Sequence, residues 1–290
     1  MATKKEIVSK IEEIKRVTNI KVNSYKTITR GGESLIIEIN GKWIFRFPRN
    51  SISKENTKER LDFLISFAKI SPLKIPIPKY IEDGFVGYEK IQGSHPRPTN
   101  IKNLTERDRL KIAKQIGLFL KGLHNFKSKK INFDTGYLVM RKDDYKTCPK
   151  EISKYLNTDE IKNLEVKLKA IANNPLNFKK PTSIIHGDFY FNNIIWNPDK
   201  KVITGVIDWA NLGLGTPAMD FIMLADFNKN KNDKFLKNIL KYYGAKGDDL
   251  FFQIKENAII DTMNWFWSYY KENNSKGVVK MIKKLKNILA

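Results

Sequence analysis

Three polar side chains suited to magnesium binding and proton transfer follow apolar strands between residues 184 and 209. Asp188 comes in a tight turn directly after one strand, Asn193 lies five residues later, and Asp208 ends the next hairpin strand. Because they sit at strand ends, we expect these side chains to lie close together. Mg²⁺ prefers hard oxygen ligands and keeps several waters, so a carboxylate and an amide, supplemented by substrate phosphates, form a natural site. The other carboxylate could then accept a hydroxyl proton, as in phosphoryl transfer.

The His-Gly-Asp sequence that ends at Asp188, with Asn193 after it and an Ile-Asp-Trp sequence around Asp208, resembles the catalytic and metal loops of the aminoglycoside phosphotransferase family. This family comprises small-molecule relatives of the protein kinases. By the resemblance, Asp188 is the catalytic base, and Asn193 and Asp208 hold Mg²⁺. His186 then serves mainly as a structural anchor of the loop. A His-Gly-Asp sequence alone is an ordinary turn, so the spacing to the other two residues carries the likeness.

The resemblance extends over most of the chain. Residues 43–48 are similar to the family's third strand, residues 116–124 to its central C-lobe helix and residues 215–221 to the segment after the metal loop. The third strand and the hinge at residues 90–93 are most similar to the 2″-aminoglycoside kinases, and macrolide phosphotransferases share the basic third strand. The resemblance implies transfer of a γ-phosphoryl group from ATP or GTP to the hydroxyl of a small molecule.

Arg46 stands where kinases of this kind carry a lysine that contacts the α- and β-phosphates. Strand alternation places Arg46 and Ile44 on one face and Phe45 on the other, so Arg46 could point toward the nucleotide. An arginine binds phosphate bidentately but is bulkier than lysine and not interchangeable with it. We expect Glu59, on the following helix, to pair with Arg46, with Glu55 as the alternative. An exposed strand cation is the competing interpretation of Arg46.

Two backbone segments complete the expected nucleotide site. The Gly-Gly-Glu-Ser sequence that ends at Ser34 lies between two strands, where a turn could close over the phosphates and supply N–H donors. An ordinary hairpin turn explains this sequence equally well. Backbone groups between Glu89 and Ile91, at the hinge, are expected to hydrogen-bond the purine edge. Residue identities there do not distinguish ATP from GTP.

The pattern of apolar residues predicts how these segments are positioned. Alternating residues bounded by Gly and Pro predict antiparallel strands in the first ninety residues. Spacings of three and four predict helices, one in the first ninety residues and several after Gly93. The expected fold is therefore an α+β, two-lobed, protein-kinase-like architecture. Its N-terminal nucleotide-binding lobe (1–92) is an antiparallel sheet plus one helix, and its C-terminal catalytic and substrate-binding lobe (93–290) is mainly helical. The expected strands are 25–29, 35–40, 42–47, 79–82, 87–91, 183–185 and 202–207, and the expected helices are 53–70, 107–126, 161–172 and 238–243.

Composition limits the class of protein. The chain of 290 residues carries 53 Lys and Arg against 31 Asp and Glu, a formal charge of +22. Such an excess suggests nucleic acid, but the lysines are scattered and no zinc or RNA-binding signature accompanies them, so we expect a Lys-rich surface. With 41% hydrophobic residues, one cysteine and no run of 18 apolar residues, we expect a cytoplasmic, monomeric enzyme with no membrane span.

The acceptor is expected to bind the C-terminal helices, as the resemblance implies, with an aminoglycoside antibiotic as the leading candidate and resistance as its consequence. From Asp220 onward there are 8 acidic residues against 13 lysines, which fits a polycationic acceptor poorly. A kinase of a macrolide or of a choline- or homoserine-like metabolite is the alternative. A catalytically silent module that binds nucleotide or nucleic acid is the second.

Three further side-chain features bear on the C-terminal lobe. His124 is expected to be a packed helix-end residue without a catalytic role. Asp220 is expected to cap or brace a helix start, with substrate contact as the other interpretation. An aromatic cluster between Trp265 and Tyr270, with Asp261 before it, is expected to pack the core or, alternatively, to stack on a ligand.

Overall fold

The computed structural model forms two compact units. The structure describes residues 2–28, 34–49, 57–128, 131, 149–179, 182–225 and 234–289. The first unit comprises Met1–Arg97, Phe126–Ile131 and Phe191–Ala210, and the second comprises Pro98–Asn125, Asn132–Tyr190 and Asn211–Ala290. The first unit therefore includes two later segments in addition to the N-terminal residues that the sequence assigned to it.

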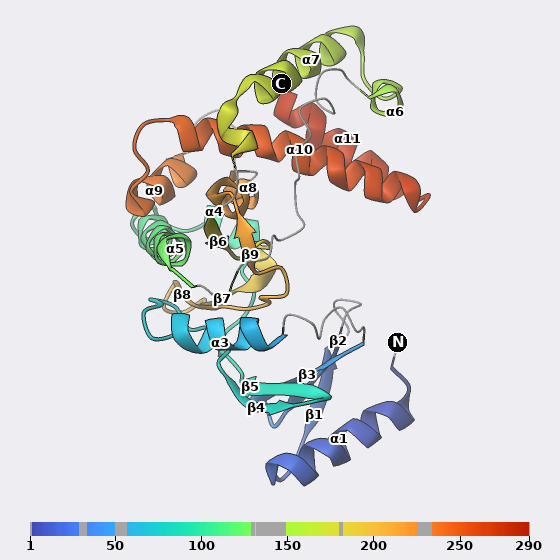
Figure 1. The fold of residues 1–290 in the computed structure, drawn as a ribbon, viewed down its shortest axis with the longest axis vertical. Coiled ribbons are helices and arrows are strands. Elements are labelled where there is room, and N and C mark those ends of the chain that lie inside the picture. Colours follow the sequence, from blue (N-terminus) through green and yellow to red (C-terminus); the bar gives the residue numbers. More distant parts are fainter. Residues whose placement is uncertain are drawn as a thin grey trace. The chain divides into compact units, whose positions relative to one another are not determined.

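The first unit is built around a five-stranded antiparallel sheet of order β1-β2-β3-β5-β4 (Figure 1). A tight turn makes β2 and β3 neighbours in the sheet, because Asn40 and Gly41 between them both have positive φ. The elements of this unit are α1 (Lys4–Thr18), β1 (Tyr25–Ile28), β2 (Ser34–Ile39), β3 (Trp43–Pro48), α3 (Thr57–Phe67), β4 (Pro78–Glu82), β5 (Phe85–Glu89), η3 (Phe191–Asn193), β7 (Ile194–Asn197) and β8 (Val202–Val206).

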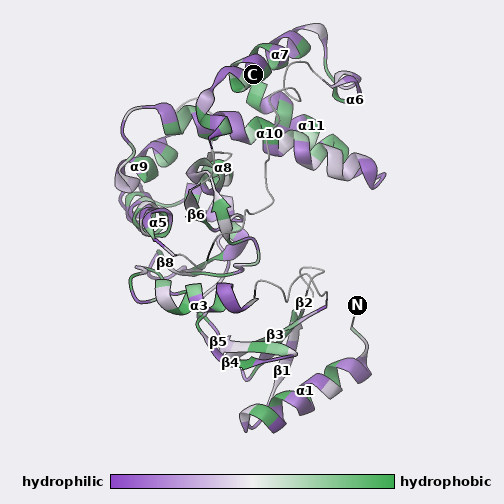
Figure 2. Cartoon of the chain, in the orientation of Figure 1, coloured by the Kyte–Doolittle hydropathy of each residue, from purple (hydrophilic) through white to green (hydrophobic). Residues whose placement is uncertain are grey.

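One face of this sheet is covered by α1. Thr3 and Glu6 form a capping box at its start, and its apolar stripe places Ile11 and Ile14 against the sheet. Phe45 and Phe47 of β3 are buried in the same cluster, as the expected alternation requires. Figure 2 shows hydrophobic and hydrophilic residues alternating along α1. Arg46, between these two phenylalanines, therefore lies on the opposite face of the sheet.

The β7–β8 hairpin belongs to the first unit although it follows much of the second in the chain. An isolated bridge pairs Lys74 with Gly205, and another pairs Ser94 with Trp196. A Cβ on Gly205 would come within 2.6 Å of the Lys74 carbonyl oxygen, so only glycine permits this approach. These backbone contacts hold the hairpin to the segments that flank β4 and β5.

The second unit is mainly helical. It also contains one two-stranded sheet, in which β6 pairs antiparallel with β9. Its elements are α4 (Pro98–Lys102), α5 (Glu106–Asn125), α6 (Lys150–Ser153), α7 (Thr158–Asn173), η2 (Pro175–Phe178), β6 (Ser183–Ile185), β9 (Gly213–Gly215), η4 (Pro217–Phe221), α8 (Ile222–Ala225), α9 (Lys234–Tyr243), α10 (Asp249–Lys271) and α11 (Ser275–Leu289). None of the helices that the structure describes combines the length and apolar composition that crossing a bilayer requires.

Two packing regions organise these helices. Helices α6, α7, α10 and α11 bury one apolar cluster that includes Leu168, Ile260 and Leu285. Elsewhere α5 packs closely on α9, because Gly117 allows the two backbones to approach. The predicted helices and strands correspond to observed elements with shifted ends, but where the sequence predicted one helix in the first ninety residues, the structure has α1 in addition to α3. The largest strand shift is in β5, which ends at Glu89 and not at Ile91.

The contact between α5 and α9 predicts opposite effects for two glycines on one helix. A Cβ at Gly117 would lie 2.6 Å from the Ile239 carbonyl oxygen, whereas one at Gly122 would meet nothing within 4 Å. Gly117→Ala should therefore lower the free energy of unfolding by about 1–3 kcal/mol through overpacking. Gly122→Ala should raise it by up to about 1 kcal/mol through helix propensity. Urea denaturation measures both, and equal effects of the two changes would contradict the described packing.

Candidate active site

In the first unit, Asn193 and Asp208 lie at the same end of the β7–β8 hairpin. Ile194 is paired with Val206, so the residues just outside this pair are neighbours. The Ile207 amide donates a 2.8 Å hydrogen bond to the Asn193 carbonyl oxygen, which continues the ladder by one step. Asn193 is buried and Asp208 is partly exposed. The structure thus brings together the two residues that the sequence predicted as metal ligands.

The backbone of Asp208 adopts an uncommon conformation. Its φ is +62°, in the left-handed region, which aspartate tolerates better than most residues. Such conformations cluster at functional sites, where the surrounding structure enforces them. Here the conformation directly follows β8 and turns the chain where the carboxylate must be presented.

Arg46 pairs with Asp208. Its Nη1 donates to Asp208 Oδ1 at 3.1 Å, and the two side chains are 24% and 41% exposed. An ion pair with this exposure contributes modestly to stability, so it can exchange with other partners. The predicted phosphate-binding cation and a predicted metal ligand are therefore in direct contact.

The expected pairing of Arg46 with Glu59 is not what the structure contains. Glu59 lies in the first turn of α3, and its buried Oε2 has no hydrogen-bond partner in the described part of the chain. The alternative, Glu55, lies outside the described residues. Sequence order placed a glutamate on the correct helix, but the pairing depends on where that helix is positioned against β3, which residue spacing does not fix.

Tyr88 is a further member of this group that the sequence did not single out. It is paired with Ile44 in the β3–β5 ladder, two positions from the pair of Arg46 with Val86. Burial raises the pKa of the Tyr88 hydroxyl above its usual value, the Arg46 charge opposes this shift, and the Asp208 charge adds to it. A hydrogen bond from Arg46 also lowers the pKa of Tyr88. The register of β3 and β5, which is set by long-range pairing, is the signal that identifies Tyr88.

The expected hinge follows β5. The Lys90 amide donates to the Lys42 carbonyl oxygen at 2.7 Å, so this residue still pairs with the segment before β3. Because hydrogen-bonding groups alternate along a strand, the Glu89 carbonyl and the Ile91 amide point away from that partner. The Glu89 side chain is exposed and forms a 2.8 Å ion pair with Lys79, which lowers the pKa of Glu89. The expected contact of this segment with a purine therefore falls to the backbone groups of Glu89 and Ile91 and not to the Glu89 side chain.

The other expected contact with the nucleotide lies beside Ser34. This residue begins β2, where it is paired with Pro48. The Gly-Gly-Glu turn before it lies outside the described residues. The role of Ser34 remains a prediction.

In the second unit, Asp188 follows a turn that is held by a buried carboxylate. The amides of His186 and Gly187 donate to Asp220 Oδ2 and Oδ1 at 2.8 and 2.9 Å. The Asp188 amide donates to His186 Nδ1 at 3.2 Å. Gly187 has a φ of +77°, and a Cβ there would lie 2.3 Å from the Asn211 carbonyl oxygen, so the turn needs glycine. His186 is fully buried and acts as the expected loop anchor.

Asp220 was expected to cap or brace a helix start, and the structure shows that it braces a turn instead. It is 1% exposed and lies in η4, which follows the β9 strand that pairs with β6. Besides the two backbone amides, it accepts a 3.0 Å hydrogen bond from His124 Nε2. A buried carboxylate is tolerated when several donors replace its lost hydration. Asp220 therefore braces the turn before Asp188.

His124 is the packed helix-end residue that the sequence predicted. It is 3% exposed in the last turn of α5. Since a carboxylate only accepts, His124 Nε2 carries the proton shared with Asp220. Its Nδ1 lies 3.0 Å from the Tyr243 hydroxyl. Burial, with the nearby Asp220 charge, raises the pKa of Tyr243 to about 12.

The residues of the first unit fit a magnesium ion. Asn193 and Asp208 offer an amide oxygen and a carboxylate, which are hard donors. Such a sparse protein donor set is typical of sites where water and substrate phosphates supply the remaining ligands.

Acidic residues near the C-terminus are mostly engaged within the protein. Asp261 is buried and lies 3.5 Å from Lys284, and Glu256 accepts hydrogen bonds from two asparagines. Asp248 and Asp249 are exposed at the start of α10, and Asp226 and Asp233 lie outside the described residues.

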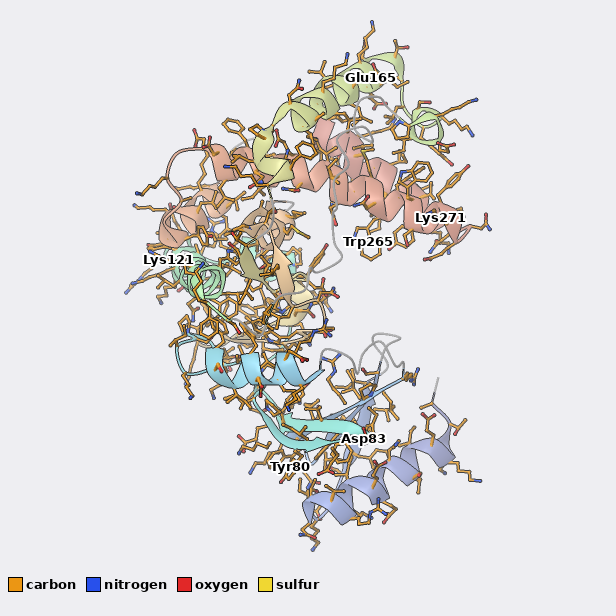
Figure 3. The ribbon with its side chains drawn as sticks, viewed as in Figure 1. Tyr80, Asp83, Lys121, Glu165, Trp265 and Lys271 are labelled. Atoms are coloured by element: carbon orange, nitrogen blue, oxygen red, sulfur yellow. The ribbon has the colours of Figure 1, made fainter. Side chains whose placement is uncertain are left out.

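The aromatic cluster of α10 divides into buried and exposed members. Trp267 and Tyr269 pack against the core, whereas Trp265, labelled in Figure 3, is 36% exposed. Core packing, the expected role, therefore accounts for part of the cluster.

The fold and these side chains define a class of protein. An antiparallel sheet with a basic third strand, a hairpin with an Asn and an Asp at one end, and an anchored His-Gly-Asp turn are the parts of a kinase-like phosphoryl-transfer enzyme.

A family model described as "Phosphotransferase enzyme family" matches residues 25–252. The chain belongs to this family. Family membership and the structural neighbours below support a small-molecule phosphotransferase.

Three solved structures are similar over nearly their whole length. The GDP and kanamycin complex of APH(2″)-IIIa matches with a TM-score of 0.78 at 19% identity, covering 97% of this chain and 98% of that one. The gentamicin complex of APH(2″)-IIa matches with a TM-score of 0.72 at 22% identity, covering 100% of this chain and 99% of that one. Macrolide 2′-phosphotransferase type I matches at 0.66 and 16%, covering 98% of each. At these identities the likeness confirms the expected two-lobed kinase-like fold.

The raised pKa of Tyr243 predicts a pH dependence of stability. The folded state holds this proton more tightly than the unfolded chain, whose tyrosines ionise near 10. The stabilising contribution is thus complete below pH 10 and is lost as the pH rises through 12. The difference in unfolding free energy between wild type and Tyr243→Phe should shrink over this interval. Denaturation at a series of pH values measures it, and a difference that grows would contradict the assignment.

Proposed function

We propose that this protein transfers the γ-phosphoryl group of ATP or GTP to a hydroxyl of a small molecule, with an aminoglycoside as the leading acceptor. The observation that carries the proposal is the placement of Asn193 and Asp208 at one hairpin end with Arg46 bound to Asp208. This arrangement offers ligands for a cation beside a group that binds phosphate. Phosphoryl transfer needs mainly such positioning and charge neutralisation.

Asn193 and Asp208 would hold Mg²⁺, which supplies charge neutralisation on the phosphate oxygens when it is bound. Arg46 would bind the α- and β-phosphates with its planar guanidinium. Backbone groups of Glu89 and Ile91 would hydrogen-bond the purine, and Ser34 would contribute at the phosphates. Glu59, which the structure leaves unpaired with Arg46, keeps no assigned partner.

Asp188 would act as the general base. It would accept the proton of the acceptor hydroxyl as the oxygen attacks the γ-phosphorus, while the bond from that phosphorus to the β–γ bridging oxygen breaks and the nucleoside diphosphate leaves. The Asp220 bonds to His186 and Gly187 support this role, because they fix the turn that presents Asp188. Positioning of a base in this way contributes directly to rate.

The acceptor is argued from similarity and from charge. Two of the similar structures are complexes with kanamycin or gentamicin, which favours an aminoglycoside. A macrolide is the second candidate, because a macrolide phosphotransferase shares the fold and this chain has an excess of basic residues. Most described acidic residues near the C-terminus already have partners, so a polycation would depend on few carboxylates.

Asp188→Ala tests the proposed role directly. The change removes the proton acceptor, so turnover should fall by about 10²-fold to 10⁴-fold while nucleotide affinity stays within about twofold. The measurement is phosphoryl transfer from ATP and from GTP by the purified protein across a panel of aminoglycosides and macrolides, with calorimetric nucleotide binding alongside.

Asp199→Asn is the matched control, because this exposed carboxylate lies in the turn after β7 and should leave turnover unchanged. Unchanged turnover in Asp188→Ala would overturn the proposal. Nucleotide binding by the wild type without transfer to any acceptor would favour the silent binding module instead.

A further inference from the structure

An arginine in the third strand binds a phosphate only when its guanidinium group is correctly oriented, whereas a lysine has no such requirement. The lysine ammonium is a compact charge, whereas a guanidinium donates only in its own plane and along fixed directions. A mobile Arg46 would present its donors to a phosphate only part of the time. A chain that carries arginine here gains from neighbouring acceptors that hold its plane.

The β3–β5 register places Tyr88 where it can do so. Ile44 is directly opposite Tyr88, and Arg46 is directly opposite Val86. Arg46 and Tyr88 are thus diagonal neighbours on one face, a separation that aromatic and long side chains span. This face is opposite the one that α1 covers.

The guanidinium of Arg46 has two described acceptors. Nη1 donates to Asp208 Oδ1 at 3.1 Å, and a second hydrogen bond joins Arg46 to the Tyr88 hydroxyl. Bonds to one acceptor on β5 and to another just beyond the end of β8 fix both the position and the plane of the group. Because a guanidinium has five N–H donors, these bonds do not exclude a phosphate.

We propose that Tyr88 is a positioning residue of the nucleotide site, whose hydroxyl, together with Asp208, holds Arg46 in the orientation that meets the phosphates. This inference rests on the proposed function. Tyr88 acts through Arg46 and needs no contact of its own with the nucleotide. If Mg²⁺ takes over the Asp208 carboxylate, the Tyr88 hydroxyl would continue to hold Arg46.

A double-mutant cycle tests the inference without measuring turnover. The variants are Tyr88→Phe, Arg46→Met and the combination, and calorimetry gives the affinities for ATP, GTP, adenosine and guanosine in the presence of Mg²⁺. Tyr88→Phe should lower the affinity for the triphosphates by about tenfold, which corresponds to the loss of one charge-assisted hydrogen bond. The affinity for the nucleosides should not change. In the Arg46→Met background the same change should have no further effect.

Tyr80→Phe is the matched control for losing a tyrosine hydroxyl. Tyr80 lies in the neighbouring strand β4 and packs against Trp43 and Phe45 on the other face of the sheet (Figure 3). Triphosphate affinity should be the same as in the wild type. Circular dichroism establishes that each variant is folded.

A second background keeps the test decisive if Arg46→Met disturbs the fold. In Arg46→Lys the cation is a point charge that needs no orientation, so Tyr88→Phe should change triphosphate affinity by less than about twofold.

Three results would overturn the inference. Equal losses for nucleosides and triphosphates would mean that Tyr88 acts on the base, and an undiminished loss in Arg46→Met would mean that it acts on the fold. Tight triphosphate binding by Tyr88→Phe alone would contradict it directly. A wild type that binds no nucleotide would instead contradict the proposed function, and this inference with it.

Discussion

The buried carboxylate of Asp220 is the constraint on which the candidate catalytic turn depends. Its charge is stable in the interior only while His124 and the amides of His186 and Gly187 donate to it. Two of these donors belong to the turn itself, so moving the turn would leave a buried charge without hydration. The free-energy cost of burying the Asp220 carboxylate therefore also restrains the geometry of the turn before Asp188.

In the first unit, by contrast, the paired charges are not fully buried. Arg46 and Asp208 are partly exposed, so their bond is weak enough to be exchanged, as the proposed binding of a cation and a triphosphate requires. The hairpin that carries Asp208 is fixed by backbone pairing, as at Ile194 and Val206, and not by this ion pair. A rigid backbone with exchangeable side-chain bonds suits a site whose partners bind and leave at each cycle.

Local patterns gave most of the fold and part of the site. The alternation around Phe45 predicted which face of β3 is buried, and the His-Gly-Asp turn with Asn193 and Asp208 identified a hairpin end correctly. The partners of Arg46 and Asp220 could not be read in this way. They depend on strand register and on how α3, α5 and η4 pack, which are long-range consequences of the whole chain. The shift of β5 by two residues is an example, because alternation of apolar residues predicts a strand but does not fix where it begins and ends.

The β7–β8 hairpin also constrains the order in which the units can fold during synthesis. It completes the first unit through bridges at Lys74 and Ser94, yet it is translated after much of the second unit. The sheet that emerges first from the ribosome must therefore wait, with the surface for this hairpin uncovered, until about residue 210 has been added. Contacts so distant in sequence slow folding and expose apolar surface in the meantime. A fragment ending near Arg97 would lack the β7–β8 hairpin with Asn193 and Asp208, so the first unit cannot be isolated by simple truncation.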